Sequence, residues 1–230
     1  GEQQVGYGHT INDDVDHALL WHGSAASVVD LNPRGFAGSR AFGTSGGRQA
    51  GWGYGPATRP EGVITGDFAH ALLWHGSAAS VVDLHSGGFF FSYALSISGR
   101  QQVGWRAVDI GIGMPVWVPH ALLWSGTAGS MVDLQGAGDG SSQAVATNGR
   151  EQVGVRGGHA LMWRGSAASV VDLHAFLPPG FATSNATGID SNGDIVGYAS
   201  LTGGPDDSHA FLWKRNIPRP VAKEQDTMRC

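Results

Sequence analysis

Five histidines begin the same pentapeptide, His-Ala-Leu/Phe-Leu/Met-Trp, and an imidazole can ligate a metal ion or transfer a proton near neutral pH. These residues are His17, His70, His120, His159 and His209. A metal site needs several ligands that converge on one point, whereas one histidine per repeat is spread through the molecule. We therefore expect each histidine to be structural, hydrogen-bonded to nearby backbone or to an aspartate of its own repeat. The candidate aspartates are Asp30, Asp83, Asp133 and Asp172.

Each pentapeptide ends in a tryptophan, and the set is Trp21, Trp74, Trp124, Trp163 and Trp213. A large ring that recurs at one repeat position favours packing between repeats, with its indole N–H bonded locally. We expect no metal site and no cofactor at these repeated positions.

Two acidic strings resemble calcium-binding loops, residues 12–16 and residues 190–194. In the second string oxygen-bearing side chains alternate, but no bidentate acid follows at the far end of the loop. Its Asn192-Gly193 pair coincides with the hairpin turn of its repeat, so turn chemistry accounts for it. Calcium remains the alternative for both strings.

The repeated histidines and tryptophans lie within longer sequence repeats, which must fold into the elements that position them. Residues 17–31 and 70–84 have the same fifteen-residue sequence, and residues 120–134 and 159–173 are close variants. A repeat of this length indicates a solenoid, an array or a propeller. One unit holds four short segments, for example residues 80–84, 92–97, 101–105 and 120–124, separated by turn dipeptides such as Ser-Gly and Asn-Gly. Four antiparallel strands per unit follow.

Alternation within His-Ala-Leu-Leu-Trp makes both faces of this strand largely apolar, so each sheet needs a neighbour on both sides. A glycine recurs inside the third strand, which indicates a close backbone approach, expected near a central axis. These glycines are Gly6, Gly51, Gly104, Gly154 and Gly197. We predict an all-β fold, a β-propeller of four-stranded antiparallel blades, with five blades.

The complete units are expected at residues 27–74, 80–124, 130–163 and 169–213, and the first strands begin a blade that something else finishes. Residues 1–213 are then one repeat domain, and residues 214–230 form a tail that resembles no repeat.

Two segments resemble the bacterial extracellular His-Ala-Phe (HAF) repeat family. Residues 209–213 have the signature His-Ala-Phe-Leu-Trp, and residues 186–198 are similar to the family's Ala-x-x-Ile-Asn-x-x-Gly-x-Val-Val-Gly strand pair. The family's Asp-Leu-Gly-Thr-Leu-Gly-Gly linker is absent. The resemblance implies a propeller-like fold and export, with an extracellular or periplasmic location, and it supplies no catalytic residues. The chain begins at Gly1, either because a signal peptide has been removed or because the sequence begins within the protein.

Composition excludes two classes of partner. The formal net charge is −5, only two lysines occur, and no run of basic residues is present, so we expect no nucleic-acid surface. No apolar stretch approaches the roughly 20 residues that span a bilayer, so we expect no membrane span.

The differences between repeats point to a ligand site. The residue after each in-strand glycine is aromatic in four copies, and the links to the next histidine vary in length and share one face of the molecule. The candidate ligand-binding residues are Tyr7, Trp52, Trp105 and Tyr198 on the strands and Asp67, Arg106, Asp109 and Trp117 beside the variable links. The rings could line a shallow funnel suited to sugars, although core packing is the alternative explanation.

The sequence therefore favours a non-catalytic binding or scaffold module, lectin-like, for a carbohydrate or a protein. One alternative is a hydrolase or lyase, with acid and base residues among Asp67, Asp109, Asp206 and Asp207. A purely structural surface protein is the other. Oligomer formation through the unfinished blade is a further expectation.

Overall fold

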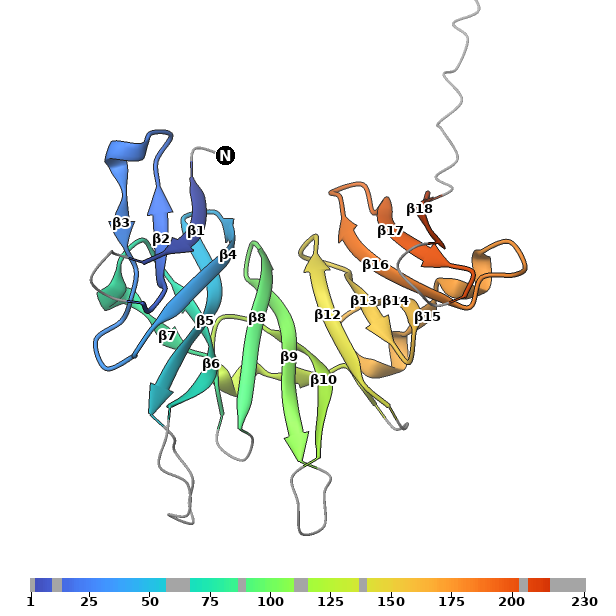
Figure 1. Ribbon diagram of the computed structural model, residues 1–230, viewed down its shortest axis with the longest axis horizontal. Helices are drawn as coiled ribbons and strands as arrows, with labels where there is room; N and C mark the ends of the chain where they lie inside the picture. Colours follow the sequence, from blue (N-terminus) through green and yellow to red (C-terminus); the bar gives the residue numbers. More distant parts are fainter. Residues whose placement is uncertain are drawn as a thin grey trace, which may run out of the picture.

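The computed structural model describes residues 3–9, 14–56, 67–86, 90–109, 116–136, 140–202 and 207–215. They form five antiparallel sheets that follow one another along the chain, with the first and fifth sheets at opposite ends of the row (Figure 1). The prediction of an all-β fold of repeated antiparallel sheets is confirmed. No helix of the described residues is long and apolar enough to cross a membrane.

Three sheets have four strands and two have three. The first sheet contains β1 (Gln4–Gly8), β2 (His17–Trp21) and β3 (Val29–Asp30). The second contains β4 (Ser39–Ser45), β5 (Arg48–Pro56), β6 (Asp67–Trp74) and β7 (Val82–Asp83). The third contains β8 (Phe91–Ser98), β9 (Gln101–Asp109), β10 (Trp117–Trp124) and β11 (Val132–Asp133). The fourth contains β12 (Ser142–Thr147), β13 (Gln152–Arg156), β14 (His159–Trp163) and β15 (Val171–Asp172). The fifth contains β16 (Thr183–Ile189), β17 (Ile195–Ser200) and β18 (Ser208–Trp213).

The short Val-Asp strand ends a sheet instead of beginning one. β7 pairs with β6 through Leu72 and Asp83, and β3, β11 and β15 likewise pair with the preceding histidine strand. The predicted unit boundaries 27–74, 80–124, 130–163 and 169–213 are therefore wrong. A one-turn 3-10 helix, such as η2 (Ala78–Ser80), reverses the chain tightly enough to keep the Val-Asp strand beside its own histidine strand.

Neighbouring sheets pack face to face. We call the face of a sheet that is directed toward the next sheet in sequence its forward face, and the opposite one its backward face. Between the first and second sheets, Ala18, Leu20 and Leu31 of the forward face pack against Leu72 and Trp74 of the backward face. The same arrangement joins the second to the third, the third to the fourth and the fourth to the fifth sheet.

A repeated hydrogen bond fastens each sheet to the next. The backbone N–H of Ala71 on β6 donates to Ser92 Oγ on β8 at 2.9 Å, and both residues are completely buried. Equivalent bonds run from β2 to β4, from β10 to β12 and from β14 to β16. A short polar side chain thus satisfies a backbone donor inside each apolar interface.

The in-strand glycines have a different cause from the one expected. A Cβ at Gly104 would lie 1.7 Å from the carbonyl oxygen of Tyr93, on the neighbouring strand of the same sheet. The strand pairing shifts register between Ala94 and Ser96, opposite this glycine. Gly51, Gly154 and Gly197 face the same irregularity. The close approach is real in the second to fifth sheets, but it arises from a β-bulge in each of them, not from crowding at a central axis.

Candidate ligand-binding site

Four of the repeated histidines bond to the expected aspartates. The Nδ1–Oδ2 distances are 2.8 Å for His17–Asp30, 2.7 Å for His70–Asp83, 3.1 Å for His120–Asp133 and 2.9 Å for His159–Asp172. The other carboxylate oxygen accepts a backbone N–H two residues on, as Asp83 does from His85 at 2.8 Å. Each aspartate thus ties the histidine strand to the connection that follows. His209 instead contacts the ring of Phe181.

Four of the five repeated tryptophans, all but Trp21, lie between sheets, but their polar atoms are not all satisfied. Trp74, Trp124 and Trp163 are completely buried, and their indole N–H groups have no hydrogen-bond partner among the described residues. Trp213 does donate, to the carbonyl oxygen of Leu173 at 3.0 Å. The expected local hydrogen bond is therefore wrong for the three buried rings, where apolar contact outweighs one unsatisfied donor.

Three of the four predicted strand aromatics belong to one row of rings. The guanidinium carbon of Arg40 lies 4.5 Å from the ring centre of Tyr7 and 5.4 Å from that of Trp52. Trp52 contacts Tyr93 edge-on at 5.4 Å, and Tyr93 stacks on Trp105 at 4.4 Å. The row therefore crosses the first three sheets.

The row ends at the fourth sheet, where the equivalent residue is Val155. Tyr198, on the fifth sheet, is 42% exposed and lies outside the row.

At one end of this row is a pocket of about 250 Å³ between the first and second sheets. Asp14, Asp16 and Arg40 supply its charged groups, and Trp52 and Tyr54 supply its rings. Tyr54 is 42% exposed, whereas Trp52 is only 8% exposed and forms the floor of the pocket. Backbone bonds fix the wall, because Tyr54 N–H donates to Gly38 and Ser39 N–H donates to Asp16, both at 2.8 Å. The volume is close to the lower limit of about 300 Å³ for small-molecule sites.

The pocket holds an ion pair. Arg40 Nε donates to Asp16 Oδ2 at 2.8 Å, and His9 lies 3.3 Å from Asp16 Oδ1. Partial burial raises the pKa of Asp16, but the hydrogen bonds from Arg40 and His9 outweigh it and lower the pKa below its usual value. The carboxylate is therefore ionised at neutral pH and can accept hydrogen bonds from a ligand hydroxyl.

The other predicted loop residues do not join this pocket. Trp117 is 37% exposed and packs edge-on against Phe90 and Phe91, whose rings also contact Phe68. Arg106 donates to Asp133 at 2.8 Å and thereby shares the aspartate of His120.

The acids expected of an enzyme are not brought together in the described part of the chain. Asp67 begins β6 and Asp109 ends β9, but their side chains, like all of Asp206, lie outside the described residues. Asp207 accepts hydrogen bonds from the N–H and the hydroxyl of Thr202, and these bonds lower its pKa.

The second calcium-like string is a turn. Asp190 Oδ1 accepts the backbone N–H groups of Asn192 and Asp194 at 2.8 and 2.9 Å, so its carboxylate is occupied within the hairpin. Part of the first string, Asn12 and Asp13, lies outside the described residues. Across the described ranges, no group of three His, Cys, Asp or Glu side chains is arranged to hold a metal ion.

Sequence reasoning missed Arg40 and considered Asp16 only as part of a calcium-like string, so it did not find the pair that completes the pocket. They are 24 residues apart and come from different sheets, so no short motif joins them. The available signal was position, because Arg40 is paired with Trp52 across β4 and β5 and must share its face. No family model, no curated protein and no solved structure matches the chain.

Proposed function

We propose that the protein is an exported, non-catalytic binding module of propeller-like architecture that holds a carbohydrate in the pocket of Asp16, Arg40 and Tyr54. The observation that carries this proposal is the ion pair of Asp16 and Arg40 beside the exposed ring of Tyr54. A planar carboxylate and a guanidinium bind vicinal hydroxyl groups, and an aromatic ring covers the apolar side of a sugar.

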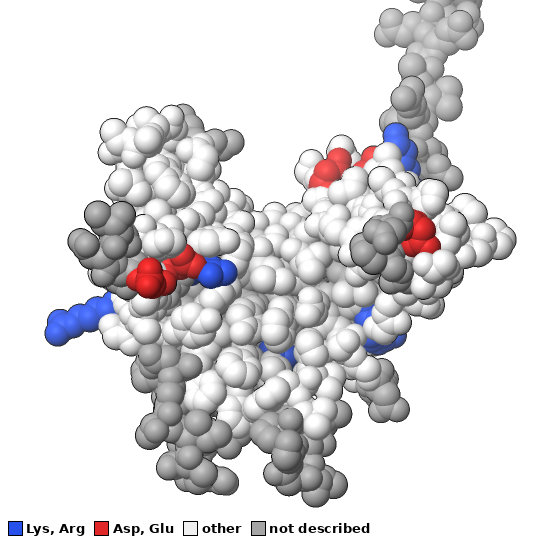
Figure 2. Space-filling model, viewed as in Figure 1, with Lys and Arg blue, Asp and Glu red and all other residues white. Residues whose placement is uncertain are grey.

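The charges in the pocket limit the class of ligand. Figure 2 shows that the middle region of the face in view carries few Lys, Arg, Asp or Glu side chains. Arg40 balances the charge of Asp16, and Asp14 adds a second carboxylate to the lining, so the pocket disfavours an anionic ligand and favours hydroxyl groups that donate hydrogen bonds. The sequence resemblance to the His-Ala-Phe repeat family supports the extracellular or periplasmic setting.

A glycan array probed with the labelled chain tests this proposal. We expect binding of neutral glycans, and at least a tenfold loss of affinity in Tyr54→Ala, equivalent to about 1.4 kcal/mol. The matched control is Tyr198→Ala, because this tyrosine is equally exposed at 42% but lies on the fifth sheet, away from the pocket. A blank array, or equal binding by the two variants, would refute a sugar site at Tyr54. Repeating the array in EDTA separates this site from a calcium-dependent one, since only the latter would lose its signal.

A second function, assembly with another copy of the chain, is favoured by the two end faces, which no described sheet covers. On the fifth sheet Val196 is 48% and Leu212 is 51% exposed, whereas their fourth-sheet equivalents Val153 and Met162 are 0% and 7% exposed. On the first sheet, Trp21 of the backward face is partly exposed. These two faces have the residues of the forward and backward halves of one interface that occurs four times within the molecule. A second copy can therefore dock head to tail.

Light scattering with two opposing variants tests the assembly. We expect concentration-dependent oligomers of the unmodified chain, and monomers of Leu212→Arg and of Trp21→Arg, since each variant loses one of the two faces. An equimolar mixture of these variants should form a one-to-one complex, because each retains the face that the other needs. A monomeric unmodified chain, or a mixture that stays monomeric, would eliminate this mode of assembly.

A further inference from the structure

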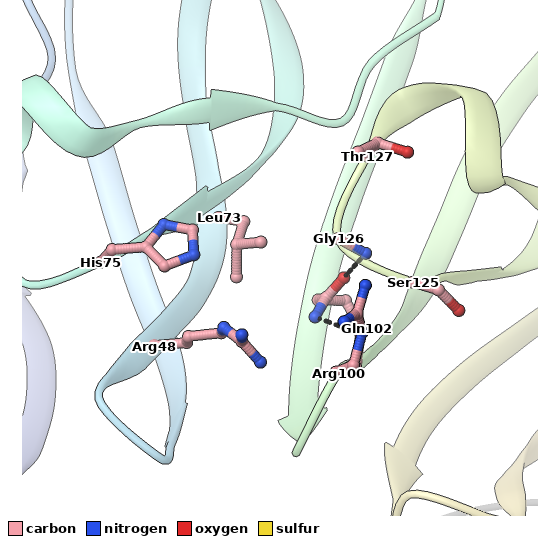
Figure 3. Close-up of a pocket in the computed structure, with 8 residues that line it drawn as sticks. All are labelled: Arg48, Leu73, His75, Arg100, Gln102, Ser125, Gly126 and Thr127. Carbon is pink, nitrogen blue, oxygen red and sulfur yellow. Dashed lines mark hydrogen bonds between the residues drawn. The ribbon is translucent and has the colours of Figure 1, made fainter.

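A small cavity of about 150 Å³ lies between the second and third sheets, at the opposite end of β5 from the sugar pocket. Figure 3 shows the guanidinium groups of Arg48 and Arg100 and the ring of His75 directed into this space. Ser125 and Thr127 contribute hydroxyl groups to its rim, and no carboxylate is among the described residues that line it. The chain has a formal net charge of −5, so this local excess of basic groups opposes the overall charge.

Hydrogen bonds hold the frame of the cavity but leave cationic groups uncompensated. Arg48 Nη1 donates to the carbonyl oxygen of Gly99 at 3.3 Å, across the two sheets. Gln102 accepts from Gly126 N–H at 2.9 Å and donates to the carbonyl oxygen of Arg100 at 2.9 Å (Figure 3). Among the described residues, no acid pairs with the guanidinium of Arg48 or Arg100.

The fourth and fifth sheets show what occupies the equivalent place. Glu151 is three residues before its in-strand glycine, as Arg48 is before Gly51. The Glu151 carboxylate accepts hydrogen bonds from Arg164 and Arg215, and Arg164 follows its tryptophan as His75 follows Trp74. There the chain supplies its own anion between basic groups. In the cavity between the second and third sheets an arginine replaces that glutamate.

We propose that this cavity is a binding site for a tetrahedral oxyanion, a sulfate or phosphate group. The guanidinium forks of Arg48 and Arg100 would bind its oxygens from the two sheets, with His75 beside them. The bound group would occupy the place that the Glu151 carboxylate fills between the fourth and fifth sheets. The inference is independent of the sugar pocket, which lies at the other end of β5.

Isothermal titration of the full chain with sodium sulfate and with sodium phosphate, at an ionic strength held constant with sodium chloride, tests the site. We expect saturable binding with one ion per chain, weakened at least tenfold in Arg48→Ala and in Arg100→Ala. The matched control is Arg150→Ala, because Arg150 follows the same hairpin turn on the next sheet but does not line the cavity. Comparison of the two anions establishes whether sulfate or phosphate is preferred.

A second variant keeps the test independent of any general loss of folding. Arg48→Glu recreates the arrangement of Glu151, so we expect a folded protein that no longer binds sulfate or phosphate. Unchanged binding by Arg48→Glu or by both alanine variants would overturn the site, as would a titration of the unmodified chain without saturable heat.

Discussion

Trp74 and Trp21 occupy the same position in two identical fifteen-residue sequences, yet Trp74 is completely buried and Trp21 is partly exposed. The difference lies in their neighbours, because the first sheet packs against the backward face of Trp74 and no described sheet covers that of Trp21. In a repeat protein, stability is approximately a sum of repeat terms and interface terms. A residue on an interior sheet contributes to both terms, whereas the same residue on an end sheet contributes mainly to the repeat term. The same substitution made at the two positions therefore measures the interface term.

The largest effect is expected at the tryptophans. Trp74→Ala should lower the free energy of unfolding by about 3–5 kcal/mol, since it empties a large volume in a close-packed interface. Trp21→Ala should cost less than about half of that, because part of the ring is already in water. Urea unfolding followed by circular dichroism gives both values, and equal losses would show that the interface contributes nothing beyond the repeat itself.

The forward faces allow the same comparison with an aliphatic side chain. Leu123 is 5% exposed and Leu212 is 51% exposed at equivalent positions. We expect Leu123→Ala to cost about 2–5 kcal/mol, and Leu212→Ala to stay within about 0.5 kcal/mol of the unmodified chain at low protein concentration. A large loss in Leu212→Ala under these conditions would mean that another part of the chain covers the fifth sheet.

Substitution of two equivalent glycines compares a strand that faces a β-bulge with one that does not. Gly104→Ala should cost about 1–3 kcal/mol or more, since its Cβ must displace the backbone of Tyr93. Gly6→Ala is the control, because its nearest contact is the Trp21 ring at 3.4 Å, and it should change stability by less than about 1 kcal/mol. Thermal unfolding compares the two, and a tolerated Gly104→Ala would contradict the bulge as the reason for the glycine.

The smallest expected effect is on the pH dependence of stability at the interface between the fourth and fifth sheets, where Glu151 forms ion pairs. Burial raises the pKa of Glu151, but hydrogen bonds from Arg215 and Arg164 outweigh it and hold the pKa below the ordinary value of 4.5. The ionised form is therefore favoured by folding, and its contribution is present above pH 4.5 and is lost as the pH falls through the lowered pKa. Stability measured from about pH 6 to about pH 3 should fall less steeply in Glu151→Gln than in the unmodified chain. Parallel curves would remove Glu151 from the acid response.

Local signals predicted the strands well. Alternating apolar residues and Ser-Gly or Asn-Gly turns depend on neighbours in sequence, so β8 and β9 and their hairpin were visible before the structure. The partner of each Val-Asp strand could not be predicted in this way. A Val-Asp strand has one histidine strand before it and another after it along the chain, and local sequence does not say which of them it pairs with. The 3-10 turn decides between them, and its sequence Ser-Ala-Ala-Ser carries no strong propensity.

The sites were harder to predict for a related reason. Tyr7, Trp52 and Trp105 were found because they share a repeat position, and repetition is visible in the sequence. Arg40 and Asp16 occur once each and meet only after two sheets have packed together. The repeat pattern shows what every sheet has in common, whereas a ligand site consists of what one pair of sheets does differently.

The identity of residues 17–31 and 70–84 has a consequence for how such a chain changes over generations. Every interface joins equivalent forward and backward positions with similar apolar residues, so duplicating or deleting one whole unit leaves the apolar part of the interfaces nearly unchanged. Near-identical coding segments also favour recombination between them. The length of the array can therefore vary by whole units at little cost in folding, while the unshared residues of each new pair of sheets are left open to selection for a different ligand.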